Sequence, residues 1–428
     1  MTTITTNPST FGAHPNPPAR SATSEIPAAD RPAPVTVPPE TPAAHPPSTI
    51  TVPAGLKGVV VADTAVGDVR GDEGFFHYGP YSAVDLARTR SLDEVWFLLT
   101  AGHLPDGEEL AGFRAEVAPH RTPSPAVLAA LPALAAATGA TAGPLDALRT
   151  AVSLEAAARG LRPVLDLTDA ERCRDALALA AVTPTLVAGL HRATLGLAPV
   201  APRDDLHGAA SYLWLLTGED PDPRAAAALE PYLVTTIDHG FNASTFTARV
   251  IASTGADVGA AVVGAIGALS GPLHGGAPSR ALDLLDEIGT VDRIEEVVGA
   301  HLAAGERIMG FGHAVYRTAD PRSELLREVA LGLGGPLVEL AVAAEDRIVA
   351  VLAEQRPGRA LRANVEYYAG VVMATVGIPR ELFTPTFASS RVIGWTAHVL
   401  EQARDRHILR PSARYVGPPP PLPVPPRP

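Results

Sequence analysis

Prolines are distributed very unevenly along this chain of 428 residues, and this distribution limits which part can fold into a packed domain. Of the 43 prolines, 13 lie in residues 1–53 and nine in residues 411–428, which leaves 21 in residues 54–410. That middle segment has roughly the 5% proline of ordinary domains. The first 53 residues carry too little apolar surface to offset the entropy lost on folding. We therefore expect a globular body with a disordered proline-rich tail at 1–53.

The chain end at 418–428 forms a second proline-rich tail, for which we expect polyproline II conformation. A PxxP-type ligand is possible in either tail, but composition favours a solvated appendage.

Composition also excludes several classes of protein. A single cysteine, Cys173, rules out a disulfide framework and a cysteine-based zinc site. The formal net charge of −12 argues against nucleic acid or an anionic membrane as the main partner. The segment after Met1 is polar and has no secretory signal pattern. We therefore expect a cytoplasmic enzyme or binding protein.

The body is predicted to be mainly helical, with one small β element near its start. Residues 58–64 and 67–78 contain two short β-branched or aromatic runs beside Gly and Asp, a pattern typical of a hairpin or small meander. Beyond them, Ser91 precedes an acidic first turn, which is a helix-start signal. Alanine-rich stretches indicate further helices, at 128–137, 174–181, 225–229 and 341–353.

One apolar segment, residues 258–269, could be mistaken for a membrane span. Its run of Gly, Ala, Val and Ile ends after 12 residues, short of the roughly 20 that cross a bilayer. We interpret its small residues as the place where two helices approach closely, in the core or at a subunit interface.

Three histidines are candidates for chemistry because they stand in polar or glycine-flanked loops after apolar segments. They are His239, His274 and His313. Glycines beside an imidazole let the backbone approach a ligand closely. The sequence contains no HExxH or CxxC motif and no carboxylate at helical ligand spacing, so we expect no metal site. It also lacks the G-x-S-x-G and G-x-G-x-x-G patterns of serine hydrolases and dinucleotide-binding folds.

Five longer motifs carry a specific resemblance. They are NASTFTARV at 242–250, GALSGPLHGGA at 267–277, RIMGFGHAVYRTADPR at 307–322, NVEYYAG at 364–370 and FTPTFASSRVIGWTAHVLEQ at 383–402. In these motifs and their order the chain resembles the citrate synthase family, within it the bacterial citrate/2-methylcitrate synthase branch, from about Gly55 to Gly417.

The resemblance implies a role for each histidine. His274 matches the residue that donates a hydrogen bond to the enol oxygen of the acyl-CoA. His313 matches the residue that delivers a proton to the carbonyl oxygen of oxaloacetate, and His239 lies at the oxaloacetate site. Neutral histidines together with a carboxylate suit the enolisation of a thioester near pH 7.

The resemblance also implies three arginines that hold the substrate carboxylates: Arg322, Arg391 and Arg410. A planar guanidinium binds a carboxylate through two hydrogen bonds, which suits this task. In the family the last of these comes from the partner subunit. The resemblance therefore implies a homodimer with shared active sites.

The catalytic base departs from the family pattern. The family has Asp in an NVD step, whereas this chain has Glu366 in the corresponding NVE step. The unperturbed pKa values of the two acids differ little, so basicity is not the difficulty. The extra methylene moves the carboxylate by more than an ångström, and errors of that size can cost about 10²-fold in rate. Either the site is remodelled to suit Glu366, the interpretation we favour, or turnover is impaired.

The phosphates of CoA need positive charge, yet Lys57 is the only lysine in the chain. Arginine must therefore supply that charge. Arg317 is the best-placed candidate, and Arg362 and Arg359 are weaker ones. In the family, the loop around Gly310 and Gly312 also offers backbone groups to the adenine.

The resemblance predicts a two-domain helical fold with the site in the cleft. The large domain would comprise 55–275 and 379–417, and the small domain 276–378. The predicted reaction is an acyl transfer in which acetyl-CoA, oxaloacetate and water give citrate and CoA, without a cofactor.

Two alternatives stay open. One is a 2-methylcitrate synthase that uses propionyl-CoA, because one methylene changes discrimination by only about 1–3 kcal/mol. The other is a catalytically weak binding or regulatory protein, which Glu366 and the long tails suggest.

Overall fold

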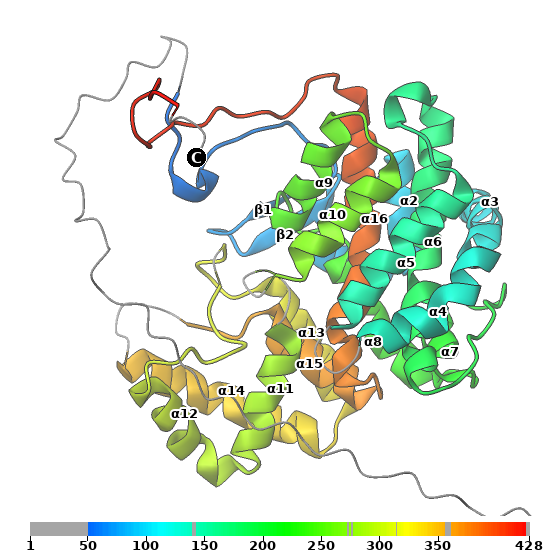
Figure 1. Ribbon diagram of the computed structural model, residues 1–428. Helices are drawn as coiled ribbons and strands as arrows, with labels where there is room; N and C mark the ends of the chain where they lie inside the picture. The colour runs from blue at the N-terminus through cyan, green and yellow to red at the C-terminus, as the bar shows by residue number, and fades with distance from the viewer. Residues whose placement is uncertain are drawn as a thin grey trace, which may run out of the picture. The chain divides into compact units, whose positions relative to one another are not determined.

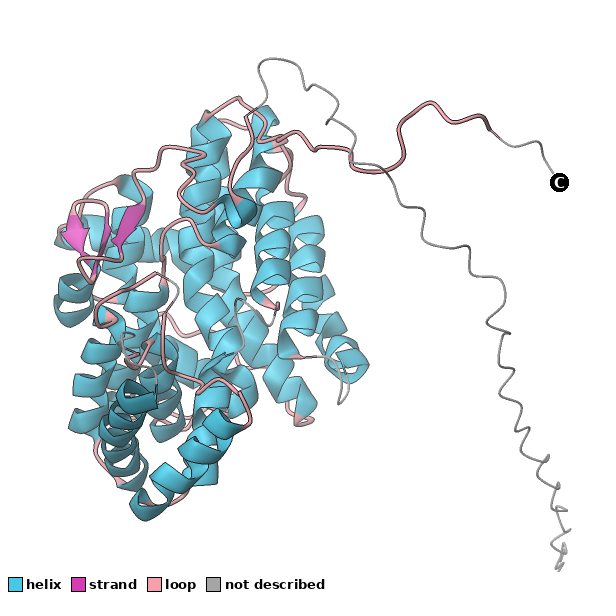
Figure 2. Cartoon of the chain, turned by 90° about the vertical axis from the view of Figure 1, so that its left-hand side faces the viewer, coloured by secondary structure: helices cyan, strands magenta, loops and turns pink. Residues whose placement is uncertain are grey.

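The computed structural model shows a mainly helical protein with one small sheet (Figure 2). It describes residues 50–138, 143–271, 274, 277–313, 315–355 and 361–424, with 277–279 described by their backbone only. Residues 1–59 and 60–428 form separate units. In the first unit, the described part contains one short 3-10 turn, Ala54–Leu56.

Sixteen α-helices occur in the described part of the chain. The first eight are α1 (Ala83–Thr89), α2 (Leu92–Ala101), α3 (Gly107–Val117), α4 (Pro125–Thr138), α5 (Pro144–Arg159), α6 (Asp169–Thr194), α7 (Gly208–Thr217) and α8 (Pro223–Thr236). The second eight are α9 (Ala243–Ser253), α10 (Val258–Leu269), α11 (Ala277–Ile288), α12 (Ile294–Ala303), α13 (Pro321–Leu333), α14 (Pro336–Gln355), α15 (Val365–Thr375) and α16 (Phe383–Arg404).

The sheet is an antiparallel meander of β1 (Gly67–Arg70), β2 (Phe75–Tyr78) and β3 (Tyr81–Ser82). The second predicted β run therefore forms strands, in the register that pairs Val69 with Phe76. The first run, residues 58–64, was wrongly predicted as a strand. Its Val60 is 84% exposed, so the run gains little of the packing that favours β-branched residues in sheets.

Helix starts follow the local sequence signals. The Ser91 hydroxyl accepts a hydrogen bond from the amide of Glu94, and the Glu94 carboxylate accepts one from the amide of Ser91. This reciprocal capping box confirms the predicted start of α2. All four alanine-rich stretches lie in helices, namely α4, α6, α8 and α14.

Helix α16 is the buried spine of the larger helical group, and it packs against α6, α9 and α10 (Figure 1). The small residues of α10 permit close packing, as predicted. A Cβ on Gly264 would lie 2.2 Å from Ile251 of α9, and one on Gly259 would lie 2.3 Å from Ala156 of α5. In the described residues, one helix, α6, is long and apolar enough to cross a membrane, but 78% of its apolar window is buried inside the protein.

Helices α11 to α15 pack mainly against one another, at the lower left of Figure 1. They also contact the larger group, where α13 and α15 meet α8. The predicted domain limits fall in the connections before α11 and before α16, and the division itself stays a prediction. After α16, residues 405–424 contain no helix or strand, and residues 418–424 are exposed. The predicted tail at 1–53 lies almost wholly outside the described residues.

Candidate active site

Most of the predicted site residues line one cavity of about 420 Å³. They come from loops and helix starts that are far apart in the sequence. The cavity is lined by His239, His274, Gly310, Gly312, His313, Arg322, Glu366 and Arg391 of the predicted set, and by Asn242, Arg307, Ile308, Met309, Phe311, Asn364, Val365 and Phe387.

His239 lies in the short connection between α8 and α9, and its Nε2 is 2.9 Å from the hydroxyl of Tyr316. Burial lowers the pKa of His239 well below its usual value, and the charges of Arg322 and Arg391 lower it further. The imidazole is therefore neutral near pH 7. A neutral ring can donate one hydrogen bond and accept another, which suits a keto-acid ligand.

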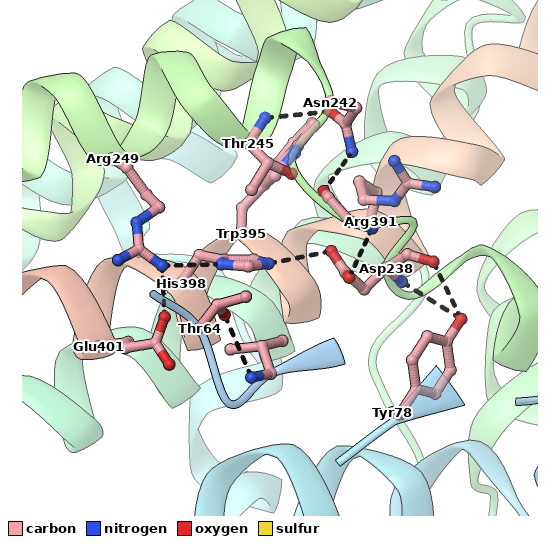
Figure 3. A network of polar contacts seen from close by, with 12 residues as sticks. Thr64, Tyr78, Asp238, Asn242, Thr245, Arg249, Arg391, Trp395, His398 and Glu401 are labelled. Carbon is pink, nitrogen blue, oxygen red and sulfur yellow. Dashed lines mark hydrogen bonds and ion pairs between the residues drawn. The ribbon is translucent and has the colours of Figure 1, made fainter. Parts of the chain in front are cut away.

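A buried polar network holds the His239 loop in place (Figure 3). The Tyr78 hydroxyl donates to the backbone oxygen of Asp238, at 3.1 Å. On the other side, Asp238 Oδ1 lies 3.3 Å from Nε2 of His398, whose Nδ1 lies 3.2 Å from Arg249. Arg249 also forms an ion pair with Glu401. Asp238, the residue before His239, is thus held by Tyr78 of β2 and by His398 of α16.

His274 is oriented by the N-terminal turn of α9. Its Nε2 accepts a hydrogen bond from the backbone amide of Ser244, at 3.2 Å, and lies 2.8 Å from the Ser244 hydroxyl. An amide N–H can only donate, so Nε2 carries no proton and Nδ1–H is left as a donor. Burial lowers the pKa of His274 to about 4, with a further contribution from Arg391. His274 is therefore a neutral hydrogen-bond donor.

His313 is held in the opposite tautomer. Its Nδ1 accepts from the backbone amides of Val315 and Tyr316, at 2.9 and 3.0 Å. The Arg322 guanidinium, which can only donate, lies 3.3 Å from Nε2. The two shorter amide contacts at Nδ1 outweigh it, so we assign the proton of the neutral ring to Nε2. Burial and the nearby Arg322 lower the pKa of His313 to about 4. This ring is also a neutral donor near pH 7.

Arg322 is a buried guanidinium at the start of α13. It makes two hydrogen bonds to the carboxylate of Asp320, through Nε at 3.0 Å and Nη2 at 2.9 Å. Asp320 also accepts from the amide of Val365 at 3.0 Å. Burial raises the pKa of Asp320, but the charge and hydrogen bonds of Arg322 outweigh it and keep the pKa below its usual value. The ion pair fixes the Arg322 guanidinium beside the cavity, with its charge balanced by Asp320.

Arg391 is the second buried guanidinium, and it comes from α16. Its Nε donates to the backbone oxygen of Thr236 at 2.7 Å, and its guanidinium carbon lies 4.4 Å from the centre of the Phe387 ring. Burial lowers the pKa of Arg391 to about 10, so it stays charged at pH 7. In contrast to Arg322, it has no hydrogen-bonded carboxylate partner among the described residues. It is available to an anion.

Glu366 stands in the first turn of α15, after the N-cap Asn364. Desolvation raises its pKa from 4.5 to about 7. Arg322 lowers this pKa and Asp320 raises it. A carboxyl group with a pKa near neutrality is a suitable general base at pH 7.

The loop that carries His313 is tied to the segment that carries Glu366. The amide of Gly312 donates to the backbone oxygen of Arg362 at 2.8 Å, and the Asn364 side chain donates to the Gly312 oxygen at 2.9 Å. Gly310 and Gly312 have φ values of 84° and 87°, a region that favours glycine. The two catalytic candidates therefore share one backbone scaffold.

Three predicted residues lie outside this cavity. Arg317 is 76% exposed and pairs with Asp72 at 3.0 Å. The side chains of Arg362 and Arg410 are exposed. Arg359 lies outside the described residues. Their proposed contacts with CoA phosphates, or with a partner subunit's substrate, stay predictions.

Several residues of the site were missed by sequence reasoning. Arg307 lines the cavity and is exposed, so it is a further candidate for anionic groups. Ser244 and Asp320, which orient His274 and Arg322, were also missed. Both lie within the family motifs at 242–250 and 307–322, so those motifs already marked these two residues as candidates. No cluster of three or more metal-binding side chains occurs in the parts of the chain that the structure describes.

Comparisons with known proteins show the family of this chain. The family model for the citrate synthase C-terminal domain matches residues 55–412. The chain belongs to the citrate synthase family. A citrate synthase of Haloferax volcanii is 40% identical over 371 residues, which cover 85% of this chain and 95% of that protein.

Two solved structures in this family are similar to the chain. Citrate synthase of Pyrobaculum aerophilum is 36% identical with a TM-score of 0.78, covering 90% of this chain and 99% of that one. Citrate synthase of Thermoplasma acidophilum, solved with carboxymethyl coenzyme A and oxaloacetate, is 27% identical with a TM-score of 0.79 and covers 87% and 97%. The predicted family, the mainly helical fold and a citrate synthase-type acyltransferase function are thereby confirmed.

Proposed function

We propose that this chain condenses acetyl-CoA with oxaloacetate and water to give citrate and CoA, with Glu366 as the base. The observation that carries the proposal is the convergence of two neutral histidines and one carboxyl group of raised pKa in a single cavity. Two buried arginines beside them supply charge for the carboxylates of oxaloacetate.

The first step is enolisation. Glu366 takes a proton from the methyl carbon of the acyl group, and the electron pair moves toward the thioester oxygen. His274 Nδ1–H donates to that oxygen as its charge grows, which lowers the barrier. Because Nε2 of His274 is held by Ser244, the ring cannot turn its acceptor nitrogen to the oxygen without losing that hydrogen bond.

The second step forms the carbon–carbon bond. The enol carbon attacks the carbonyl carbon of oxaloacetate, and the carbonyl oxygen takes a proton from His313 Nε2. The proton that Glu366 removed from the methyl group then passes through water to His313, so both groups return to their starting forms. Arg322 and Arg391 bind the oxaloacetate carboxylates, with His239 as a further donor. Water then attacks the thioester of the bound product, the carbon–sulfur bond breaks, and the CoA thiol leaves with a proton. The reaction uses two substrates and water, without a prosthetic group.

The proposal includes a soluble, cytoplasmic homodimer. Arg410 is exposed and lies outside the cavity of its own chain, so it is free to reach the site of a second copy. Arg410→Ala should then raise KM for oxaloacetate while the dimer, measured by sedimentation, persists. An unchanged KM would remove Arg410 from the site.

The decisive experiment is a thiol-release assay on the purified protein with oxaloacetate and either acetyl-CoA or propionyl-CoA. We expect the higher kcat/KM with acetyl-CoA. A clear preference for propionyl-CoA would make the protein a 2-methylcitrate synthase. No release with either, together with intact oxaloacetate binding, would favour a binding protein.

A further inference from the structure

A second, small cavity of about 30 Å³ lies beside the catalytic candidates Glu366 and His274. Its remaining walls come from three helices: Tyr232 and Thr236 of α8, Val365 and Ala369 of α15, and Thr384 and Phe387 of α16. A buried water needs about 10–15 Å³ of such space. The cavity therefore has room for one or two waters, and none for a substrate.

Tyr232 brings an unpaired hydroxyl to this cavity. Its side chain is 1% exposed, and its hydroxyl has no hydrogen-bond partner among the described residues. Burial raises the pKa of Tyr232, and the charge of Glu366 is one of the contributions that raise it further. The hydroxyl thus keeps its proton and is a donor without an acceptor.

Glu366 brings the complementary acceptor. In the described part of the chain, its carboxylate has no hydrogen-bond donor, although its backbone amide is capped by Asn364. Buried polar groups are nearly always paired, with protein or with water. Here the buried Tyr232 hydroxyl and the half-buried Glu366 carboxylate, which also lines the larger cavity, meet at one small cavity with room for a bridging water.

We propose that Tyr232 is a positioning residue that holds the Glu366 carboxylate through one water in the small cavity. Glutamate has one more rotatable bond than aspartate, so its carboxylate needs an additional contact to stay in one place. The contact with Tyr232 is how this chain accommodates Glu366 at the position of the family's aspartate. The inference rests on the proposed function, in which Glu366 is the base.

Other titratable groups act on Glu366 and must stay constant in a test. Arg322 and Asp320 act from the start of α13. His274 lines the small cavity, and Arg391 of α16 lines the larger one. Three acids of the other neighbouring helices are engaged elsewhere: Glu345 of α14 with Arg327 and Tyr368, and Asp283 and Asp286 of α11 with Arg380.

The test is Tyr232→Phe, which removes only the hydroxyl. We expect kcat to fall about 10- to 100-fold, the range for a reacting group displaced by about 1 Å, with KM for oxaloacetate unchanged. The acid limb of the kcat profile should move to higher pH, because the charged form of Glu366 loses a donor. In a Glu366→Asp background, the same substitution should change kcat less than about threefold, because the shorter carboxylate is out of reach of Tyr232.

Tyr212→Phe is the matched control. Tyr212 is equally buried, but its hydroxyl pairs with Thr386 at 2.8 Å and does not line the small cavity. The Tyr212→Phe substitution should leave the acid limb of the kcat profile at the same pH. Equal losses of kcat from Tyr232→Phe in both backgrounds, or an unmoved pH limb, would overturn the proposal by assigning Tyr232 a structural role only.

An infrared titration of the Glu366 carboxyl needs no turnover and separates the two proposals. The Glu366 band is the one lost in Glu366→Gln. Tyr232→Phe should raise its apparent pKa whether or not the protein condenses substrates. An unchanged pKa contradicts the role of Tyr232, while absence of thiol release from the unmodified protein contradicts the proposed function.

Discussion

Asp320 and Glu366 are two carboxyl groups at the edge of the same site, and their surroundings differ in hydrogen bonding. Asp320 accepts hydrogen bonds from the guanidinium of Arg322 and from the amide of Val365, the residue just before Glu366. The Glu366 carboxylate accepts none from the described residues. The pKa of Asp320 is below its usual value, while that of Glu366 is raised to about 7.

This contrast separates an acid held in an ion pair from an acid without a hydrogen-bond donor among the described residues. Burial raises both pKa values, because a charge is disfavoured away from water. Only Asp320 has a paired cation and backbone donors to compensate. The hydrogen-bond donors in this region therefore go to Asp320, which holds Arg322 in place. Glu366 receives none from the described residues and can take a proton.

Glu366→Gln should have the largest effect on activity. Loss of a general base costs about 10²–10⁴-fold in kcat, and a thiol-release assay measures it. Calorimetry should show unchanged oxaloacetate binding, because Gln keeps the size of the side chain. Activity within threefold of the unmodified protein would mean that another group is the base.

Asp320→Asn should have the largest effect on stability. It leaves Arg322 as a buried charge without its partner, which costs about 3–5 kcal/mol. Chemical denaturation would measure the loss of unfolding free energy. A loss below 1 kcal/mol would mean that the Arg322 charge is solvated in some other way, and the contrast with Glu366 would disappear.

The pH dependence of kcat/KM should report Glu366 alone among the catalytic groups. Activity should fall as pH drops through about 7, because the base becomes protonated. His274 and His313 have pKa values of about 4 and stay neutral across this limb. A limb near pH 4.5 would show that Glu366 is solvated in the working enzyme.

The same two acids should give opposite slopes of stability with pH. The folded protein holds the Glu366 proton between pH 4.5 and about 7 more tightly than the unfolded chain, so this group's contribution to stability falls as pH rises through that window. Asp320 contributes stability above its unfolded pKa of 3.8 and loses it as pH falls. The free energy of unfolding, measured at several pH values in the unmodified protein and in Glu366→Gln, would isolate the contribution of Glu366.

Asp72→Asn should have the smallest effect and extends the comparison to a solvated carboxylate. Asp72 pairs with Arg317, and both side chains are more than 75% exposed. Exposed pairs contribute about 0–1 kcal/mol, so thermal unfolding should change little. If Arg317 binds CoA phosphates, Arg317→Ala should raise KM for acetyl-CoA, whereas Asp72→Asn should not.

Local signals in the sequence were sufficient for much of the fold. Ser91 at a helix start and the alanine-rich stretches were interpreted correctly, because capping and helix propensity act within a few residues. Residues 58–64 were misassigned because a β-branched run forms a strand only where a partner strand and a buried face exist. A segment of seven residues carries no information about its partner strand or its burial.

The sequence by itself predicted most of the residues that line the candidate site. His274, His313 and Arg322 stand in motifs whose order and length are specific to one family. Tertiary structure decided what those residues are chemically, because tautomer and pKa depend on groups that are distant along the chain. Ser244 determines which nitrogen of His274 is free to donate, and burial among packed helices raises the pKa of Glu366. No local pattern holds that information, since desolvation arises only when the helices pack.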